Sequence, residues 1–267
     1  MGEIKEFKNK TALVTGGNSG IGAAIAKAFG KNGANVIIHY LEKKDVFYPE
    51  SSVAEAVINE KKGALEIKSE IEKLGGKAEI ISANLAGLEN IEGFYDKAVT
   101  IYGKIDFLVN NAAHCELPDT IEKTSLGSVT RHFEVNTFAP VLLIKHFVKH
   151  LTKEPGTKGS IVNISTDAAQ KFANQISYGA SKAALEAYTR SVAMEIGKYN
   201  ITVNTIAPGP IQTGVYPKDL VKQVSPDIPM LRFGTPEEIG SVALFLCSEA
   251  ASYLTGQVIK VSGGHAL

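Results

Sequence analysis

Short runs of aliphatic and β-branched residues alternate along the chain with longer segments in which apolar residues recur at helical spacing. A short apolar run without polar alternation is typical of a strand buried on both faces of a parallel sheet. The helical segments between the runs are typical of the crossovers that parallel strands require. The predicted strands are Thr11 to Thr15, Asn35 to His39, Ala78 to Ser82, Asp106 to Asn110, Ser160 to Ser165, Thr202 to Ile206 and Gln257 to Val261.

This alternation continues to the end of the chain without a repeat, a low-complexity tract or a linker rich in Pro, Gly or Ser. It predicts an α/β fold in which residues 1–267 form a single doubly wound, Rossmann-like domain around a seven-stranded parallel sheet. The predicted helices are Ile21 to Lys31, Leu65 to Leu74, Ile91 to Tyr102, Leu126 to Leu151, Tyr178 to Ile196 and Pro236 to Cys247.

Two connections are longer than a crossover requires. A surface insertion near residues 42–62 carries Lys43 and Lys44 at its start, and we expect a short helix in it over Ser52 to Glu60. A Pro-rich segment near residues 212–235 follows the sixth strand. Long connections at the carboxyl ends of strands hold lids and substrate contacts in α/β folds, so this second segment is the predicted substrate loop.

The charge balance excludes whole classes of partner. The 28 basic and 28 acidic residues cancel, so the chain lacks the basic excess that drives nucleic-acid binding. No apolar run reaches the ~18 residues of a membrane span, and we expect a cytoplasmic protein with no membrane partner. Cys115 and Cys247 lie far apart without metal-ligand spacing, so neither a disulfide nor a metal site is predicted.

A glycine-rich loop follows the first strand and leads directly into a helical segment. This loop, TGGNSGIG, spans Thr15 to Gly22. Glycine lets the backbone turn tightly and approach a pyrophosphate, which then binds the amides at the helix N-terminus. Because strand, loop and helix follow in order, the segment predicts dinucleotide binding rather than a plain turn.

A tyrosine and a lysine lie four residues apart in a later helical segment, YGASK, from Tyr178 to Lys182. This spacing puts both side chains on one face of a helix. A nearby positive charge favours a phenolate, so Lys182 would lower the pKa of Tyr178 from the usual value of about 10. Such pairs are also common on solvated helices, and the neighbouring motifs decide between the two interpretations.

The chain resembles the short-chain dehydrogenase/reductase family over nearly its whole length. The motifs that carry the resemblance occur in the family's order: TGGNSGIG at 15–22, NNAA at 110–113, VN at 135–136, YGASK at 178–182 and PGPIQT at 208–213. The resemblance implies an NAD(P)-dependent oxidoreductase that interconverts a carbonyl and a secondary alcohol by hydride transfer. Tyr178 would be the proton donor and acceptor, Lys182 would assist it and hold the nicotinamide ribose, and Asn136 would order a water in the proton relay.

A further catalytic group implied by the resemblance, a hydroxyl that polarises the substrate oxygen, falls on one of two adjacent residues. The family's serine lies thirteen residues before the tyrosine, and that count selects Ser165. Strand register counted forward from Gly159 selects Thr166. Register fixes side-chain direction while a loop can lose a residue, which favours Thr166 slightly, and both remain candidates.

The choice between NAD and NADP depends on the residues after the second strand, where a carboxylate would bind the ribose hydroxyls and repel a 2′-phosphate. No acid stands immediately after the predicted strand, where Tyr40 and Leu41 follow His39, so we favour NADP over NAD, although the arginine usual for NADP is also missing. The resemblance implies these cofactor contacts, with Ala113 in place of a family glycine beside them: Gly16, Asn18, Ser19, Gly20, Ile21, Gly22, Tyr40, Leu41, Asn84, Leu85, Asn110, Ala112, Tyr178, Lys182, Pro208, Gly209, Ile211 and Thr213.

The substrate stays open beyond a small-molecule carbonyl or alcohol. Pocket walls are expected at residues 113–117, 167–177 and 215–232, and 3-oxoacyl-thioester reduction is one activity within the family's range. Small residues in the helix at Tyr178 permit close packing, and the resemblance implies a homodimer or homotetramer. The competing hypothesis is a catalytically inactive dinucleotide-binding sensor or scaffold, which the presence of both Tyr178 and Lys182 disfavours.

Overall fold

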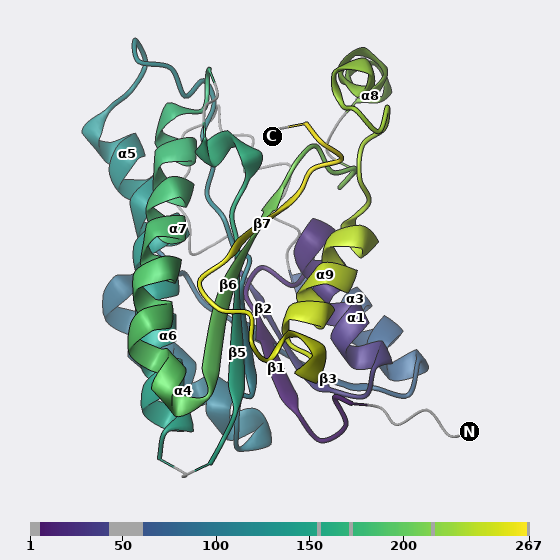
Figure 1. Cartoon of the computed structure of the whole chain (residues 1–267), viewed down its shortest axis with the longest axis vertical. Helices are drawn as coiled ribbons and strands as arrows, with labels where there is room; N and C mark the ends of the chain where they lie inside the picture. Colours follow the sequence, from purple (N-terminus) through teal and green to yellow (C-terminus); the bar gives the residue numbers. More distant parts are fainter. Residues whose placement is uncertain (1–5, 43–60, 154–155, 171–172, 215–216, 266–267) are drawn as a thin grey trace.

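A parallel sheet of seven strands forms the centre of the molecule (Figure 1). The computed structural model describes residues 6–42, 61–153, 156–170, 173–214 and 217–265. The strands lie in the order β3-β2-β1-β4-β5-β6-β7. Their bounds are β1 Thr11–Val14, β2 Asn35–Tyr40, β3 Lys77–Ser82, β4 Phe107–Asn110, β5 Gly159–Ile164, β6 Ile201–Pro208 and β7 Val258–Val261.

The strand order reverses at β1 and β4, which pair directly through Ala12 with Phe107 and Val14 with Val109. The loops that follow these two strands therefore leave the sheet side by side at its carboxyl edge. In doubly wound folds this switch point is where ligands bind. The predicted fold class and all seven predicted strands are confirmed, with ends that differ by one or two residues.

Helices cover both faces of the sheet (Figure 1). Leu13 and Ile37 face one core while Val14 and Ile38 face the other, so both faces of β1 and β2 are buried. This double burial explains why the strands are continuous apolar runs in the sequence. One face packs against α1 (Gly20–Lys31), α3 (Lys61–Lys73) and α9 (Pro236–Leu246), and the other against α4 (Ile91–Tyr102), α6 (Ala139–Leu151) and α7 (Ile176–Ile196).

Several predicted helices needed correction. The predicted helix from Leu126 to Leu151 is divided into α5 (Leu126–Phe133), a π-helical turn (Glu134–Phe138) and α6, because the apolar spacing continues through the turn and hides it. The predicted substrate loop contains a helix, α8 (Lys218–Val224), and α3 begins before the predicted Leu65. The short helix expected over Ser52 to Glu60 lies outside the described residues.

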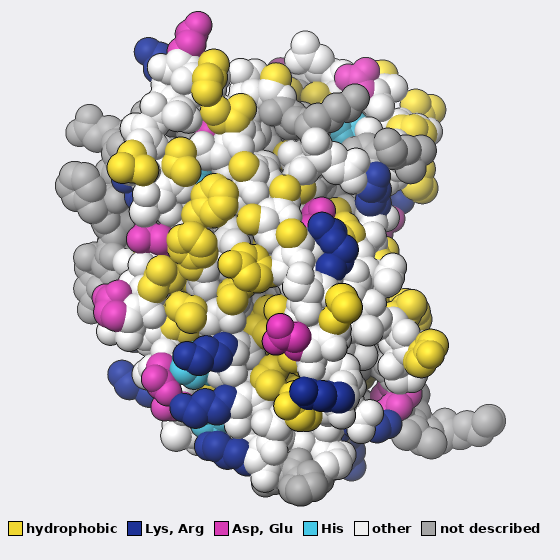
Figure 2. Space-filling view, turned by 60° about the vertical axis from the view of Figure 1, so that its left-hand side comes forward, with side chains coloured by type: hydrophobic (Ala, Val, Ile, Leu, Met, Phe, Trp, Pro, Cys, Tyr) yellow, Lys and Arg dark blue, Asp and Glu magenta, His cyan; other side chains and the backbone are white. Residues whose placement is uncertain are grey.

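Exposed apolar side chains gather on the face formed by α5, the π-helical turn and α7 (Figure 2). The large ones are Leu126, Phe138, Tyr188 and Met194, which are 84%, 42%, 43% and 88% exposed. An exposed apolar patch of this kind is typical of a site that contacts another molecule.

In the part of the chain that the structure describes, no helix has both the length and the apolar character needed to cross a bilayer.

Candidate active site

The glycine loop after β1 has a backbone that only glycine tolerates. Gly16 and Gly20 have φ of 61° and 50°, in the left-handed region that side chains disfavour. A Cβ on Gly22 would lie 2.1 Å from the carbonyl oxygen of Gly16 and 2.5 Å from Nδ2 of Asn111. The backbone of the loop therefore packs directly against the first turn of α1, with no space for a side chain at Gly22.

Asn111 fastens this loop to the end of β4. Its side-chain amide donates to the carbonyl oxygens of Thr15 and Gly16 at 2.9 and 3.0 Å. The Thr15 hydroxyl donates to the carbonyl of Val109 and accepts from the backbone amides of Asn111 and Ala112. Asn111 was not among the predicted contacts, although it is the second asparagine of the NNAA motif, which was the available signal.

A buried histidine holds the same loop from the other side. The amide of Gly16 donates to Nδ1 of His39 at 3.0 Å, and Nε2 lies 3.1 Å from the carbonyl oxygen of Ala83. Because Nδ1 accepts, the ring is neutral and Nε2 donates to Ala83. Burial lowers the pKa of His39 to about 4, so the ring stays neutral at physiological pH.

The N-terminus of α1 fits the pyrophosphate of a dinucleotide. Ser19 is extended and its side chain makes no capping hydrogen bond, so it leaves the first amides of α1 to another acceptor. A hollow of about 330 Å³ beside this turn is lined by Asn18, Ser19 and Gly20, with Thr213 among the residues across from them. A Cβ on Gly20 would lie 3.3 Å from Cγ2 of Thr213. The predicted contacts Asn18, Ser19, Gly20 and Thr213 are thus brought together, and backbone amides and hydroxyls are the donors that phosphate requires.

Other predicted cofactor contacts have buried side chains. Leu85 and Ile211 are each 5% exposed and pack in the two cores, so only their backbones can face a ligand. The side-chain oxygen of Asn84 accepts from the amide of Ala86 at 3.0 Å and builds a local turn. Gly209, after Pro208 at the end of β6, donates its amide to the carbonyl of Val261.

The end of β2 differs from its prediction by one residue. The strand continues through Tyr40, which is 3% exposed and belongs to the core. Its hydroxyl donates to Oε1 of Glu42 at 3.3 Å. A carboxylate, that of Glu42, therefore stands two residues past the strand within a long hydrogen bond of Tyr40, and the half-buried Leu41 lies between Tyr40 and Glu42.

Asn110 faces the interior of the sheet rather than the glycine loop. It is 2% exposed, and its amide donates to the side-chain oxygen of Asn163 on β5 at 2.8 Å. Asn163 in turn donates to the hydroxyl of Thr189 on α7. The side chain of Asn110 therefore links β4 to β5 and, through Asn163, to α7, while its buried Oδ1 has no hydrogen-bond partner among the described residues. Its contact with the cofactor stays a prediction.

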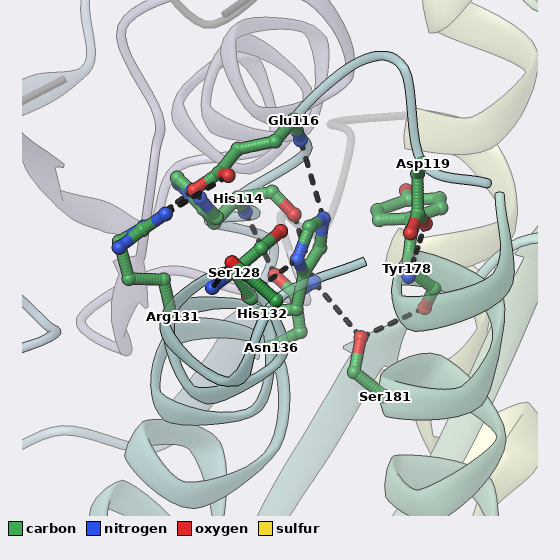
Figure 3. Close-up of polar contacts among 10 residues, drawn as sticks. His114, Glu116, Asp119, Ser128, Arg131, His132, Asn136, Tyr178 and Ser181 are labelled. Atoms are coloured by element: carbon green, nitrogen blue, oxygen red, sulfur yellow. Dashed lines mark hydrogen bonds and ion pairs between the residues drawn. The ribbon is translucent and has the colours of Figure 1, made fainter. Parts of the chain in front are cut away.

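Tyr178 lies in the first turn of α7, and a buried aspartate fixes that turn. The carboxylate of Asp119 accepts from the backbone amides of Ser177 and Tyr178 at 2.8 and 2.9 Å (Figure 3). Asp119 is 3% exposed and places a negative charge at the positive end of the helix dipole. No sequence signal links it to Tyr178, because the two residues are separated by 59 positions.

Lys182 follows one turn later on α7 and is 1% exposed. Its Nζ donates to the carbonyl oxygen of Ile164, the last residue of β5, at 2.8 Å. Burial lowers the pKa of Lys182 to about 8, so the ammonium still predominates at pH 7. A charged lysine is thus held between the end of β5 and the helix face that carries Tyr178.

Asn136 lies in the π-helical turn and is fully buried. Its side-chain oxygen accepts from the amide of His114 at 2.7 Å, while its Nδ2 donates to the carbonyl of His114 and to the hydroxyl of Ser181 (Figure 3). Ser181 donates to the carbonyl of Tyr178. Both amide hydrogens of Asn136 are therefore used, and an ordering role for Asn136 toward a relay water stays a prediction.

An ion pair supports the loop after β4 where it meets Asn136. Arg131 donates to both carboxylate oxygens of Glu116, and it holds the pKa of Glu116 down to about 2 (Figure 3). Glu116 also lies 2.7 Å from Nε2 of the buried His114. His132 accepts from the amide of Glu116 through Nε2. This network keeps the backbone of His114 rigid, and with it the orientation of Asn136.

The two candidate hydroxyls have different surroundings. Ser165 is 3% exposed and donates to Oε1 of Glu186 on α7 at 2.7 Å. Thr166 is half-buried at the carboxyl edge of the sheet, where its oxygen accepts from the amide of Ala168 at 3.2 Å. Ser165 is committed to a structural bond, and this supports the register argument for Thr166.

The two cysteines stay protonated thiols. Burial raises the pKa of Cys115 to about 11 and raises that of Cys247 as well. Neither thiol is therefore an activated nucleophile. Among the described residues, no three His, Cys, Asp or Glu side chains are grouped so as to hold a metal ion.

Comparison with known proteins places this geometry in a family. Residues 49–266 match a family model described as enoyl-(acyl carrier protein) reductase. NADPH-dependent aldehyde reductase 1 of Arabidopsis thaliana is 34% identical over 97% of this chain and 87% of its own length. A short-chain dehydrogenase/reductase mutant of Serratia marcescens superposes with a TM-score of 0.85 at 28% identity, over 98% of this chain and all of that one.

A second solved structure contains a nicotinamide cofactor. The blue fluorescent protein from a metagenomic library, in complex with NADPH, has a TM-score of 0.85 and 29% identity over 98% of this chain and all of its own. These similarities span the glycine loop, the sheet and the Tyr178 helix alike. The chain belongs to the short-chain dehydrogenase/reductase family of oxidoreductases.

Proposed function

We propose that the chain is an NADP-dependent reductase that converts a small-molecule carbonyl to a secondary alcohol, or carries out the reverse oxidation. The observation that carries this proposal is the placement of Lys182. Its ammonium is buried, donates to the carbonyl oxygen of Ile164 and lies one helical turn from Tyr178, so its charge is available to the helix face that carries the phenol. Perturbed, buried charges of this kind cluster at functional sites.

In the proposed reaction each residue has a separate role. A bound reduced nicotinamide would supply the hydride to the carbonyl carbon. Tyr178 would donate the proton to the carbonyl oxygen, and Lys182 would stabilise the resulting phenolate by its charge. Thr166 would donate a hydrogen bond to the same oxygen and so stabilise the charge that develops there.

The preference for NADP rests on the residue after β2 and on relatives. Leu41 directly follows the strand, where an acid would repel a 2′-phosphate. The Arabidopsis relative is named for NADPH dependence, and the blue fluorescent protein was solved with NADPH. The carboxylate of Glu42, 3.3 Å from the hydroxyl of Tyr40, is the feature that would favour NAD, so both cofactors belong in the test.

The experiment is a cofactor and carbonyl panel. The protein is mixed with NADPH or NADH and with aldehydes, ketones and 3-oxoacyl thioesters, and the loss of reduced-nicotinamide absorbance is followed. We expect consumption with at least one carbonyl class, and NADPH favoured over NADH by about tenfold or more, the effect of ~1.4 kcal/mol at the 2′-phosphate. Tight NADPH binding without consumption across the panel would instead support an inactive sensor or scaffold.

We also propose that a second copy of the chain covers the apolar face over α7. Phe138 and Tyr188 are exposed on this face, together with Leu126 and Met194. Light scattering should give a mass two or four times that of the 28.5 kDa chain, and Tyr188→Glu should shift it toward the monomer because a charge would be buried. A monomeric wild-type protein at micromolar concentration would contradict this assembly.

A further inference from the structure

The C-terminal segment reaches the loop that carries Thr166. Nδ1 of His265 lies 2.7 Å from Oδ2 of Asp167, the residue after Thr166, and the two side chains are 15% and 9% exposed. A second bond joins the same two segments, from Nζ of Lys260 to the side-chain oxygen of Gln170 at 3.1 Å. Neither His265 nor Asp167 belongs to a motif that the function uses.

Asp167 divides its carboxylate between two partners. Its other oxygen, Oδ1, accepts from the hydroxyl of Thr166 at 3.3 Å. A contact of 2.7 Å to an imidazole is a strong hydrogen bond, whereas 3.3 Å from a hydroxyl is beyond the usual range for oxygen donors. The proton of Thr166 is therefore held loosely by Asp167, while His265 holds the carboxylate firmly.

This division has a consequence for the reaction, given the proposed role of Thr166. A hydroxyl that donates to a carboxylate cannot donate the same hydrogen to a substrate oxygen. If His265 were absent, the buried carboxylate would lose its stronger partner, and an under-bonded buried carboxylate is costly. The bond from Thr166 to Asp167 would then shorten and compete with the substrate.

We propose that His265 is a positioning residue: it draws the carboxylate of Asp167 away from Thr166 and so leaves the Thr166 hydroxyl free to bind the substrate oxygen. The inference rests on the proposed function for its kinetic consequence but not for its structural one. The C-terminal segment is well placed for this role, because Gly263 accepts from the amide of Met230 in the predicted substrate loop. The C-terminal segment thereby contacts two of the expected pocket walls, the loop at Asp167 and the predicted substrate loop.

The kinetic test compares three variants with the wild-type protein. His265→Ala should lower kcat about tenfold and leave the KM for NADPH within about twofold. Adding Asp167→Asn to that variant removes the competing charge and should restore kcat to within about threefold of wild type. Lys260→Ala, which cuts the other bond between the same segments, should leave kcat unchanged.

If His265 only fastens the C-terminal segment to the loop at Asp167, the kinetic results should differ from these. In that case the double variant would be no better than His265→Ala, or Lys260→Ala would lose activity as well, and either result overturns the proposal. Unchanged kcat in His265→Ala overturns it too. Two controls exclude a folding defect. The variants should unfold at equal temperatures, and His265→Gln, which keeps a donor to Asp167, should have near-wild-type activity.

A crystal structure of His265→Ala gives a readout that does not depend on turnover. The distance from Oγ1 of Thr166 to Oδ1 of Asp167, 3.3 Å in the wild-type chain, should contract to below about 3.0 Å, the usual range for a hydroxyl donor. An unchanged or longer distance would overturn the inference even if the chain proves to be a reductase. Contraction without any carbonyl turnover would leave the proposed function, not the inference, at fault.

Discussion

Replacing Tyr178 by Phe is expected to reduce carbonyl turnover by about 10²- to 10⁴-fold, the usual contribution of a positioned proton donor. The phenyl ring keeps the shape and packing of the first turn of α7, and the amide that Asp119 binds is unchanged. NADPH affinity should therefore stay within about twofold, as measured by titration of cofactor fluorescence. A loss confined to kcat identifies the hydroxyl as a transition-state group.

The matched control is Tyr188→Phe on the same helix. Tyr188 is 43% exposed in the single chain, and the phenylalanine keeps the ring on the proposed contact face while removing a hydroxyl that lies outside the proposed site. Its turnover should equal that of the wild-type chain. If Tyr178→Phe and Tyr188→Phe were equally active, the proposed acid would be wrong and another proton donor would have to be sought.

Replacing Thr166 by Ala should lower kcat about 10²-fold, because the hydroxyl that stabilises charge on the substrate oxygen is removed. Ser165→Ala should leave kcat within about threefold, since that hydroxyl is turned to Glu186. Ser165→Ala should instead cost about 2 kcal/mol of unfolding free energy, the usual contribution of a hydrogen bond to a charged group such as the carboxylate of Glu186. Steady-state kinetics and urea unfolding of the two variants measure both effects.

The conservative change Thr166→Ser provides the control for this pair. It keeps the hydroxyl and should retain most of the activity, which separates the loss of the donor from the loss of packing. If Ser165→Ala were the slower enzyme, Ser165 would be the catalytic hydroxyl, as the count of thirteen residues before Tyr178 indicates. Small and equal losses in both alanine variants would mean that neither hydroxyl serves the reaction.

The fold was predictable because its signals are local. β1 and β2 are buried on both faces, so they are unbroken apolar runs in the sequence. Gly16 and Gly20 stand where φ is positive, and Gly22 stands where a Cβ has no room. The π-helical turn at Asn136 was not predicted, because it has no local signal in the sequence. It keeps the apolar spacing of a helix, and only its hydrogen bonds differ.

The supporting residues of the site were not predictable, because each acts across a long stretch of chain. The contacts of Asp119 with Tyr178, of His39 with Gly16 and of His265 with Asp167 join residues that only the folded sheet brings together. The side-chain partner of Asn110 was also not predictable from the sequence. Its motif position suggested the cofactor, whereas its neighbour on β5 draws the side chain into the sheet.

The measurement that tests the central claim most directly is the yield of alcohol against NADPH consumed, with the wild-type chain and the best carbonyl of the panel. The proposed reaction predicts one alcohol formed for each NADPH oxidised, and neither product when carbonyl or protein is left out. NADPH bound tightly yet never oxidised, or oxidised without alcohol, would contradict the assignment of a carbonyl reductase.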